Sequence, residues 1–177
     1  MIIEFLNVGA NMRLTRRADY AVRMMVDLAC MSDSRWVDVG EIAQRQDVTK
    51  PFMAKIASQA AAAGLLTTQR ATGGGLALTQ PADKITLLQI LEAIDGPMAL
   101  NQCTFEPSRC PRSNKCAVHP IWEKAQQQLN ELLSNTLLSE IAMSSLFPIS
   151  IEGEELIVDT GTIIQRSGYD ESQVTKV

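Results

Sequence analysis

The apolar residues between Thr15 and Cys30 predict an amphipathic helix. They recur three and four positions apart, the spacing that places side chains on one face of an α-helix. Thr15 precedes this stretch and is a residue type that caps helix N-termini. The apolar stripe consists of Ala21, Val22, Met25, Leu28 and Ala29.

Two more helices are predicted before residue 64. A short one lies near Val39–Gln46 and is followed by a break at Asp47. The next begins with Thr49 as its cap and Pro51 in its first turn, where the missing backbone N–H costs little. It ends at Gly64, because glycine readily adopts the left-handed conformation that terminates helices.

A β-hairpin is predicted next. Leu65–Gln69 and Leu76–Thr79 have the pattern of two short strands around the glycine-rich tip Gly73-Gly74-Gly75. The order helix, short turn, second helix and glycine-tipped hairpin is typical of a winged helix-turn-helix. That order is much more specific than any single residue.

The second half of the chain is predicted to be mainly helical. Thr86 and Gln89 have capping-box spacing ahead of a helix over Leu87–Asp95, which ends at Gly96. The weakly alternating residues after Phe147 indicate a short hairpin or a mobile tail.

A long helix is predicted from Pro120 to about Ser139. Its apolar side is wide for a small domain, so we expect part of it to pair with a second copy of the chain. Packing within one chain is the alternative. The residues at helical spacing are Trp122, Ala125, Leu129, Leu132, Leu133, Thr136 and Leu137.

Composition limits the class of protein. The chain has 177 residues, of which 46% are hydrophobic, so it can bury a core. No apolar run approaches the roughly 20 residues that span a bilayer, and residues 1–11 lack the basic start of a signal peptide. We therefore expect a cytoplasmic protein without a membrane partner, whose thiols stay in a reducing compartment.

The net charge of −4 is unevenly distributed. From Met12 to Arg70 there are nine Lys/Arg and six Asp/Glu, whereas from Glu140 onward there are seven Asp/Glu and two Lys/Arg. Because the acidic excess lies largely in the tail, the N-terminal part can still meet the phosphates of DNA.

Three cysteines and the only histidine lie close together in the pattern Cys103-x6-Cys110-x5-Cys116-x2-His119. Thiolates and imidazole bind soft and borderline metals. The spacer is rich in Pro, Ser and Asn, which predicts a flexible loop. Both gaps between cysteines exceed the two to four residues typical of zinc sites, which favours an iron–sulfur cluster. Mononuclear zinc and unrelated thiols in a loop are the alternatives.

The helix that begins after Thr49 is the predicted recognition helix of the winged motif. Lysine can pair with guanine or phosphate, and an apolar side chain can touch a thymine methyl group. Arg70, at the base of the hairpin tip, can enter a narrow minor groove. The alternative for Lys50 and Lys55 is that both are solvated surface residues without a DNA contact. The first turns of the helix carry Thr49, Lys50, Phe52, Met53 and Lys55.

Motifs between Met12 and Ala142 are similar to those of a known family. They are Met12-Arg13-Leu14-Thr15, Arg17-Ala18-Asp19-Tyr20-Ala21-Val22-Arg23, Ala63-Gly64-Leu65, Arg70-x-x-Gly73-Gly74-Gly75, Pro81-Ala82, Ala93-Ile94-Asp95-Gly96, the cysteine pattern, Trp122 and Thr136-Leu137. Together they resemble the bacterial winged-helix iron–sulfur regulators that include IscR and NsrR.

The resemblance implies a homodimer whose long helices pair and whose winged domains each read half of an operator in double-stranded DNA. It also implies a cluster held by Cys103, Cys110 and Cys116 together with a fourth ligand that is not a cysteine. His119 matches that ligand in IscR-like members. Asp19, on the first helix of the partner subunit, matches it in NsrR-like members.

Two departures limit what the resemblance transfers. The first gap between cysteines has six residues where IscR has five, and the recognition-helix position that carries glutamate in IscR is Ala54 here. Asp19 also has the spacing of an ion pair with Arg23 on its own helix. Cys30 is predicted to be a core thiol.

We therefore predict a mainly α fold with a small β-hairpin wing and a long dimerisation helix. The chain divides into an N-terminal extension (1–11), a winged helix-turn-helix domain (12–96), a cluster-binding loop (97–120), a dimerisation helix (121–142) and a C-terminal tail (143–177).

The predicted function is transcription regulation, most simply repression, and not catalysis. Operator binding is expected to depend on an iron–sulfur cluster, with 2Fe-2S favoured over 4Fe-4S, that senses redox state, nitric oxide or cluster supply. A metal-free thiol switch, a structural zinc protein and an electron-transfer protein are the alternatives.

Overall fold

The computed structural model describes residues 14–31, 36–69, 74–146, 157–158 and 162–163. The predicted fold class is confirmed, because the chain is mostly helical and has an antiparallel two-stranded hairpin in the expected place. The winged part contains α1 (Arg16–Cys30), α2 (Val39–Arg45), α3 (Lys50–Ala62), β1 (Leu66–Gln69), β2 (Gly75–Leu78), the 3-10 helix η1 (Ala82–Lys84) and α4 (Leu87–Asp95).

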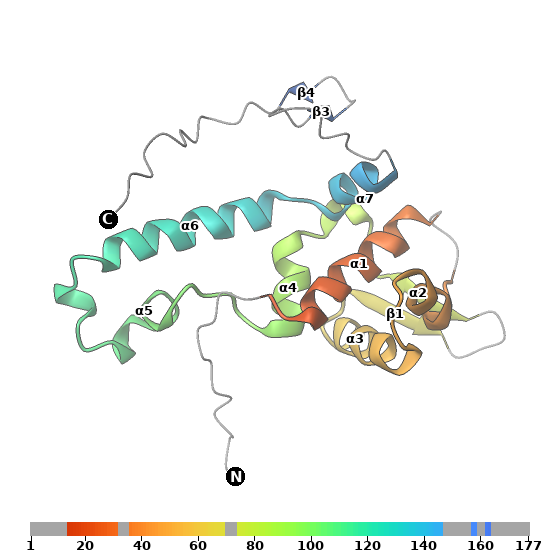
Figure 1. Ribbon diagram of the computed structural model, residues 1–177, viewed down its shortest axis with the longest axis horizontal. Helices are drawn as coiled ribbons and strands as arrows, with labels where there is room; N and C mark the ends of the chain where they lie inside the picture. The colour runs from red at the N-terminus through yellow and green to blue at the C-terminus, as the bar shows by residue number, and fades with distance from the viewer. Residues whose placement is uncertain (1–13, 32–35, 70–73, 147–156, 159–161, 164–177) are drawn as a thin grey trace, which may run out of the picture.

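The rest of the described chain is also largely helical (Figure 1). It contains α5 (Gln102–Phe105), the 3-10 helices η2 (Pro107–Arg109) and η3 (Ser113–Lys115), α6 (His119–Asn135) and α7 (Leu138–Leu146). A two-residue strand β3 (Ile157–Val158) pairs antiparallel with β4 (Thr162–Ile163) in the tail. The extension 1–11 lies outside the described residues.

The helix ends follow the predicted caps. The hydroxyl of Thr15 accepts a hydrogen bond from the Ala18 N–H at 3.2 Å. Thr86 and Gln89 make both halves of a capping box at the start of α4. Gly64 follows α3 with φ +78°, a conformation that glycine adopts without a steric penalty.

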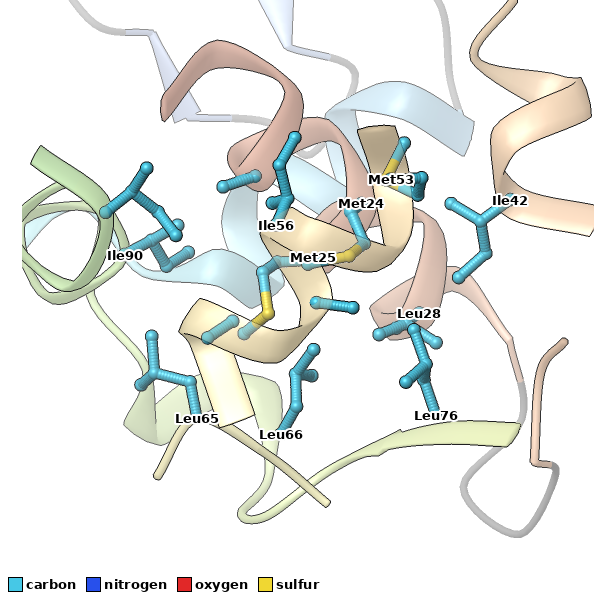
Figure 2. Packing of buried hydrophobic residues seen from close by; sticks show 14 of the residues in the cluster. Met24, Met25, Leu28, Ile42, Met53, Ile56, Leu65, Leu66, Leu76 and Ile90 are labelled. Atoms are coloured by element: carbon cyan, nitrogen blue, oxygen red, sulfur yellow. The ribbon is translucent and has the colours of Figure 1, made fainter. Parts of the chain in front are cut away.

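Helix α1 lies at the centre of the winged part and packs against α3, α4 and α7. Figure 2 shows Met24 and Met25 on this helix among side chains from α2, α3, α4 and the strands. Both methionines are fully buried, as are Ile56 and Ile90. Each large apolar side chain buried in this way contributes about 1.5–3 kcal/mol relative to exposure.

The wing is fixed to the chain that precedes α2. Leu66 lies opposite Leu78 in the register of β1 and β2. On the other edge of β2, the N–H of Val37 donates to Leu76 O at 3.0 Å and the N–H of Leu76 donates to Val37 O at 2.8 Å. A Cβ atom at Gly75 would overlap the Val37 carbonyl group, so this close approach requires glycine.

The predicted helix from Pro120 to about Ser139 is wrong in its extent. Helix α6 ends at Asn135 and a separate helix, α7, begins at Leu138. Between them the chain pairs with the segment before α4: the N–H of Leu87 donates to Thr136 O at 2.9 Å and the N–H of Leu138 donates to Ile85 O at 2.8 Å. These two bonds bring Leu138 into the core, where it is fully buried.

The predicted flexible loop between α4 and α6 also needs correction. Residues 97–118, called here the cysteine segment, form three short helical turns, α5, η2 and η3. In Figure 1, α5 lies beside the N-terminal half of α6, at the opposite end of that helix from the winged part. Within one chain, the fold therefore separates the cysteine segment from the predicted recognition helix, α3.

Candidate nucleic-acid interface and metal centre

In the first turns of α3, one side of the helix is exposed and the opposite side packs on the core. Thr49, Lys50 and Lys55 are exposed, and Phe52 is half-buried. Met53, in the same turns, is fully buried in the core and lies behind this surface. Arg70 lies outside the described residues.

An aromatic and cationic cluster on α1 lies beside this surface. The Tyr20 ring meets the Phe52 ring edge-on, with centroids 5.6 Å apart. The guanidinium groups of Arg16 and Arg23 lie 5.9 and 5.5 Å from the centroid of Tyr20, within cation–π range. This cluster was not predicted, although the spacing of four and three between Arg16, Tyr20 and Arg23 places them on one helix face.

Lys50 is oriented by an acidic residue at the start of α2. Its Nζ lies 3.2 Å from Oδ1 of Asp38. The backbone N–H of Gly40 and the side chain of Lys50 hold the pKa of the Asp38 carboxyl below its ordinary value of 3.8. At neutral pH the carboxylate is charged, so Lys50 is held at the N-terminal edge of the recognition helix.

The three cysteines of the pattern each lie within or immediately after a helical turn. Cys103 is in α5, Cys110 follows η2 and Cys116 follows η3. All three are half-buried, and the structure joins none of them in a disulfide. In the part of the chain that the structure describes, no three Cys, His, Asp or Glu side chains converge closely enough to hold a metal ion.

Cys103 is held by the turn that carries it. Its Sγ donates to Oδ1 of Asn101 at 2.9 Å, and the same oxygen accepts the Thr104 N–H at 3.3 Å. The hydroxyl of Thr104 donates in turn to Asn101 O at 2.9 Å. Asn101 therefore caps α5 and orients the Cys103 thiol.

His119 is the first residue of α6, and its side chain is 12% exposed. Nε2 lies 3.3 Å from Oε1 of Glu123, one turn further along the helix. Nδ1 is buried without a hydrogen-bond partner in the described structure. A carboxylate beside one ring nitrogen favours the proton on that nitrogen and leaves the lone pair on the other. The contact with Glu123 was not predicted, although its i,i+4 spacing from His119 is a usable signal.

Asp19 and Cys30 lie on α1, away from this segment. Oδ2 of Asp19 is 3.0 Å from Nε of Arg23, which is the ion pair that the spacing predicted. Cys30 is half-buried, with Sγ 3.3 Å from the Ser145 hydroxyl oxygen, so it lies at the contact of α1 with α7 and outside the core.

The arrangement of α2, α3 and the hairpin defines a winged helix-turn-helix, a class of DNA-binding domain. The family described as Rrf2, an iron-dependent transcriptional regulator, matches residues 14–144. The chain belongs to this family and is a DNA-binding transcription regulator. No helix among the described residues is long and apolar enough to cross a bilayer.

A relative supports this assignment, and solved structures share the fold. The chain is 30% identical over 130 residues to the HTH-type transcriptional regulator IscR of Cronobacter sakazakii, covering 73% of this chain and 80% of the relative. Its fold is similar to CymR, the global cysteine regulator of B. subtilis, with a TM-score of 0.63, 21% identity and coverage of 75% and 97% of the two chains. For IscR of T. potens the TM-score is 0.60, the identity 21% and the coverage 75% and 88%.

Proposed function

We propose that this regulator binds an iron–sulfur cluster, 2Fe-2S in preference to 4Fe-4S, and that the cluster controls its binding to operator DNA. Cys103, Cys110 and Cys116 are the proposed thiolate ligands and His119 the fourth. When bound, the cluster supplies iron that reacts with oxidants or nitric oxide. Blocking of the promoter by the bound dimer makes repression the simplest outcome.

The observation that carries the proposal is the buried, unpartnered Nδ1 of His119. A buried polar atom without a partner costs about 1–3 kcal/mol, so such atoms are uncommon unless something binds them. A ring proton on Nε2, the nitrogen beside Glu123, would leave on Nδ1 the lone pair that a metal requires. Three thiols precede this atom within seventeen residues, which is a donor set suited to iron.

Asp19 of the partner subunit is the second candidate for the fourth ligand. Its carboxylate is already paired with Arg23 at 3.0 Å, and both side chains are about half-exposed. Ligation by Asp19 requires this ion pair to open, whereas Nδ1 of His119 has no partner to lose. We therefore favour His119.

The proposed partner of the chain is a second copy. Ile121 and Leu132 on α6 are 63% and 64% exposed, and Trp122 is also exposed. Large apolar side chains in such positions are typical of a helix that pairs with another helix. We propose residues 12–96 as the DNA-binding domain, 97–120 as the cluster-binding segment, 121–142 as the dimerisation region with α6 as its pairing helix, and 1–11 and 143–177 as appendages.

The first experiment is anaerobic purification followed by absorption spectroscopy and assays of iron and acid-labile sulfide. Equal amounts of iron and sulfide with visible charge-transfer bands support the proposal. Colourless protein that takes up neither element on reconstitution overturns it. Redox-dependent DNA binding of that protein would then favour a thiol switch, and bound zinc a structural site.

The fourth ligand is tested by comparing His119→Ala with Asp19→Ala. We expect the first variant to lose its cluster at least tenfold faster in air, because one of four ligands is missing. Arg23→Ala is the matched control, since it breaks the same ion pair but keeps the Asp19 carboxylate. A short lifetime in Asp19→Ala with a normal one in Arg23→Ala would assign the ligand to Asp19.

The proposed DNA contacts are Thr49, Lys50, Phe52, Lys55 and Arg70. Replacing Lys50 with alanine should reduce the slope of log affinity against log salt by about one if it neutralises one phosphate. Arg70→Ala should weaken operator binding. Unchanged affinity and salt slope in both variants would remove these two residues from the interface.

A further inference from the structure

A single buried amide connects α6 to the cysteine segment. Gln126 is 8% exposed and is the buried polar residue of the described chain. Its Oε1 accepts the Leu100 N–H at 2.7 Å, and its Nε2 donates to Met98 O at 3.1 Å. Nε2 also donates to Oδ1 of Asn130, one turn along α6, at 2.8 Å, which fixes the orientation of the amide.

The backbone held by Gln126 leads directly to the first cysteine. Leu100 precedes Asn101, whose side chain caps α5 and accepts the hydrogen bond from Cys103 Sγ at 2.9 Å. The Thr104 hydroxyl oxygen lies 3.3 Å from Oε1 of Gln126, so the amide also reaches the end of the same turn. One side chain on α6 therefore contacts the chain on both sides of Cys103.

The turn itself has no fully buried side chain among its described residues. No side chain whose burial is described between Gly96 and Val118 is buried. A cavity of about 380 Å³ opens beside the contact, with Thr104, Gln126 and Asn130 in its wall. Because no described side chain of the turn is fully buried, the hydrogen bonds of Gln126 are a principal restraint on where the turn lies.

We infer that Gln126 is a positioning residue that holds Cys103 at the place where it binds the cluster. Only the part of the inference that concerns cluster binding rests on the proposed function; the positioning of Cys103 does not. Loss of the amide leaves the Leu100 N–H and the Met98 carbonyl without their partner and releases the turn. Cys103 then moves freely relative to His119, which begins the same helix that carries Gln126.

The test compares Gln126→Leu, Gln126→Glu and Gln127→Leu in the full-length protein. Leucine keeps the bulk of the side chain and removes every hydrogen bond, whereas glutamate keeps the acceptor for Leu100. Gln127 is the control, because it is exposed and bonds to Glu131 on its own helix. Iodoacetamide alkylation of each cysteine is followed by mass spectrometry in protein without metal, with Cys30 as the internal reference for global unfolding.

In Gln126→Leu the Cys103 alkylation rate should rise about tenfold relative to Cys30, the change expected when hydrogen bonds worth about 1.4 kcal/mol are lost. Gln126→Glu should show a smaller rise and Gln127→Leu none. In reconstituted protein, the cluster lifetime should shorten in the same order. An unchanged Cys103 rate overturns the inference, and so does a raised rate with an unchanged cluster lifetime.

Failure of the proposed function gives a different result. If no variant and no parent protein takes up iron and sulfide, the cluster proposal fails. The alkylation arm still decides whether Gln126 positions Cys103. A tenfold rise there would leave Gln126 as the residue that sets the reactivity of a thiol switch.

Discussion

The winged part and the cysteine segment are built by different means within one chain. The winged part surrounds α1 with fully buried side chains such as Met24, Met25 and Ile56. The cysteine segment buries no side chain among those described and consists of three short turns tied by Asn101 and Gln126. Apolar burial gives the first region a shape of its own, whereas the second region depends on a few polar contacts and on what it binds.

This difference suits DNA binding by the winged part and the cluster binding proposed for the cysteine segment. A recognition helix must present the same side chains to DNA in every molecule, so a packed core behind it is an advantage. A ligand segment must close around a bound group and open when that group is lost, which is compatible with marginal local stability. Changes in the two regions should therefore separate stability from cluster binding.

The largest expected loss of stability comes from the core. Met25→Ala should lower the free energy of unfolding by about 3 kcal/mol, because it leaves a cavity against α1. Met143→Ala removes the same atoms from a side chain that is 52% exposed and should cost less than about 0.5 kcal/mol. Urea denaturation measures both, and equal losses would contradict the assignment of the core.

The next largest effect is expected in the wing. Gly75→Ala should cost about 2 kcal/mol, because the new methyl group overlaps the Val37 carbonyl and the strands must separate. Amide hydrogen exchange at Val37 and Leu76 should quicken while exchange in α4 stays unchanged. Normal protection at both amides would show that the strands tolerate the added group.

Two threonines at helix N-termini, Thr86 and Thr49, should differ in their effects on stability and on DNA binding. Thr86→Ala removes a capping box and should cost about 1 kcal/mol. Thr49→Ala should cost much less, because the Thr49 side chain makes no capping hydrogen bond. Its effect should appear instead in operator affinity, measured by fluorescence anisotropy. Equal stability losses in the two variants would contradict this reading.

A substitution in the cysteine segment should have little effect on stability and a large effect on cluster binding. Cys116→Ser should change the stability of the protein without metal by less than about 0.5 kcal/mol, since no core depends on it. The same variant should fail to retain iron and sulfide after anaerobic reconstitution. A loss of 2 kcal/mol without metal would show that the segment has a core of its own.

The smallest effect concerns the ion pair of Asp38 and Lys50. Asp38→Asn keeps a capping side chain but removes the charge, and should cost less than about 0.5 kcal/mol because both groups are exposed to screening solvent. Since the folded-state pKa of Asp38 is lowered, the contribution is present above the unfolded value near 3.8 and is lost as pH falls below it. The difference in melting temperature between parent and variant should shrink as the pH falls below 3.8.

Local sequence signals were sufficient for the winged part. Thr15, Thr86, Gly64 and Gly96 mark helix ends by their own conformational preferences, and the structure places the ends there. The division of the last long helix could not be predicted, because apolar spacing continues through Leu137. The break arises from pairing with residues about fifty positions earlier in the chain.

The residues of the proposed site could be recognised from the sequence, but the residues that hold them in place could not. The cysteine pattern and His119 stand out because thiols and imidazole are chemically distinctive. Gln126 does not, since an amide on a helix usually faces water, and only the folded position of Leu100 makes it a buried partner. Sequence patterns identify reactive groups more readily than the residues that hold them.

The hydrogen bonds of Thr136 and Leu138 with the segment that precedes α4 fix one end of α6 to the winged part, and the helix projects away from that end. The helix is anchored to the winged part at its C-terminal end and carries His119 and the cysteine turns at the other, about 25 Å away for 17 residues. A tilt of about 5° at the anchor therefore displaces the far end by about 2 Å. Motions too small to disturb the core at one end are thus sufficient to shift His119 and the cysteine turns relative to the recognition helix.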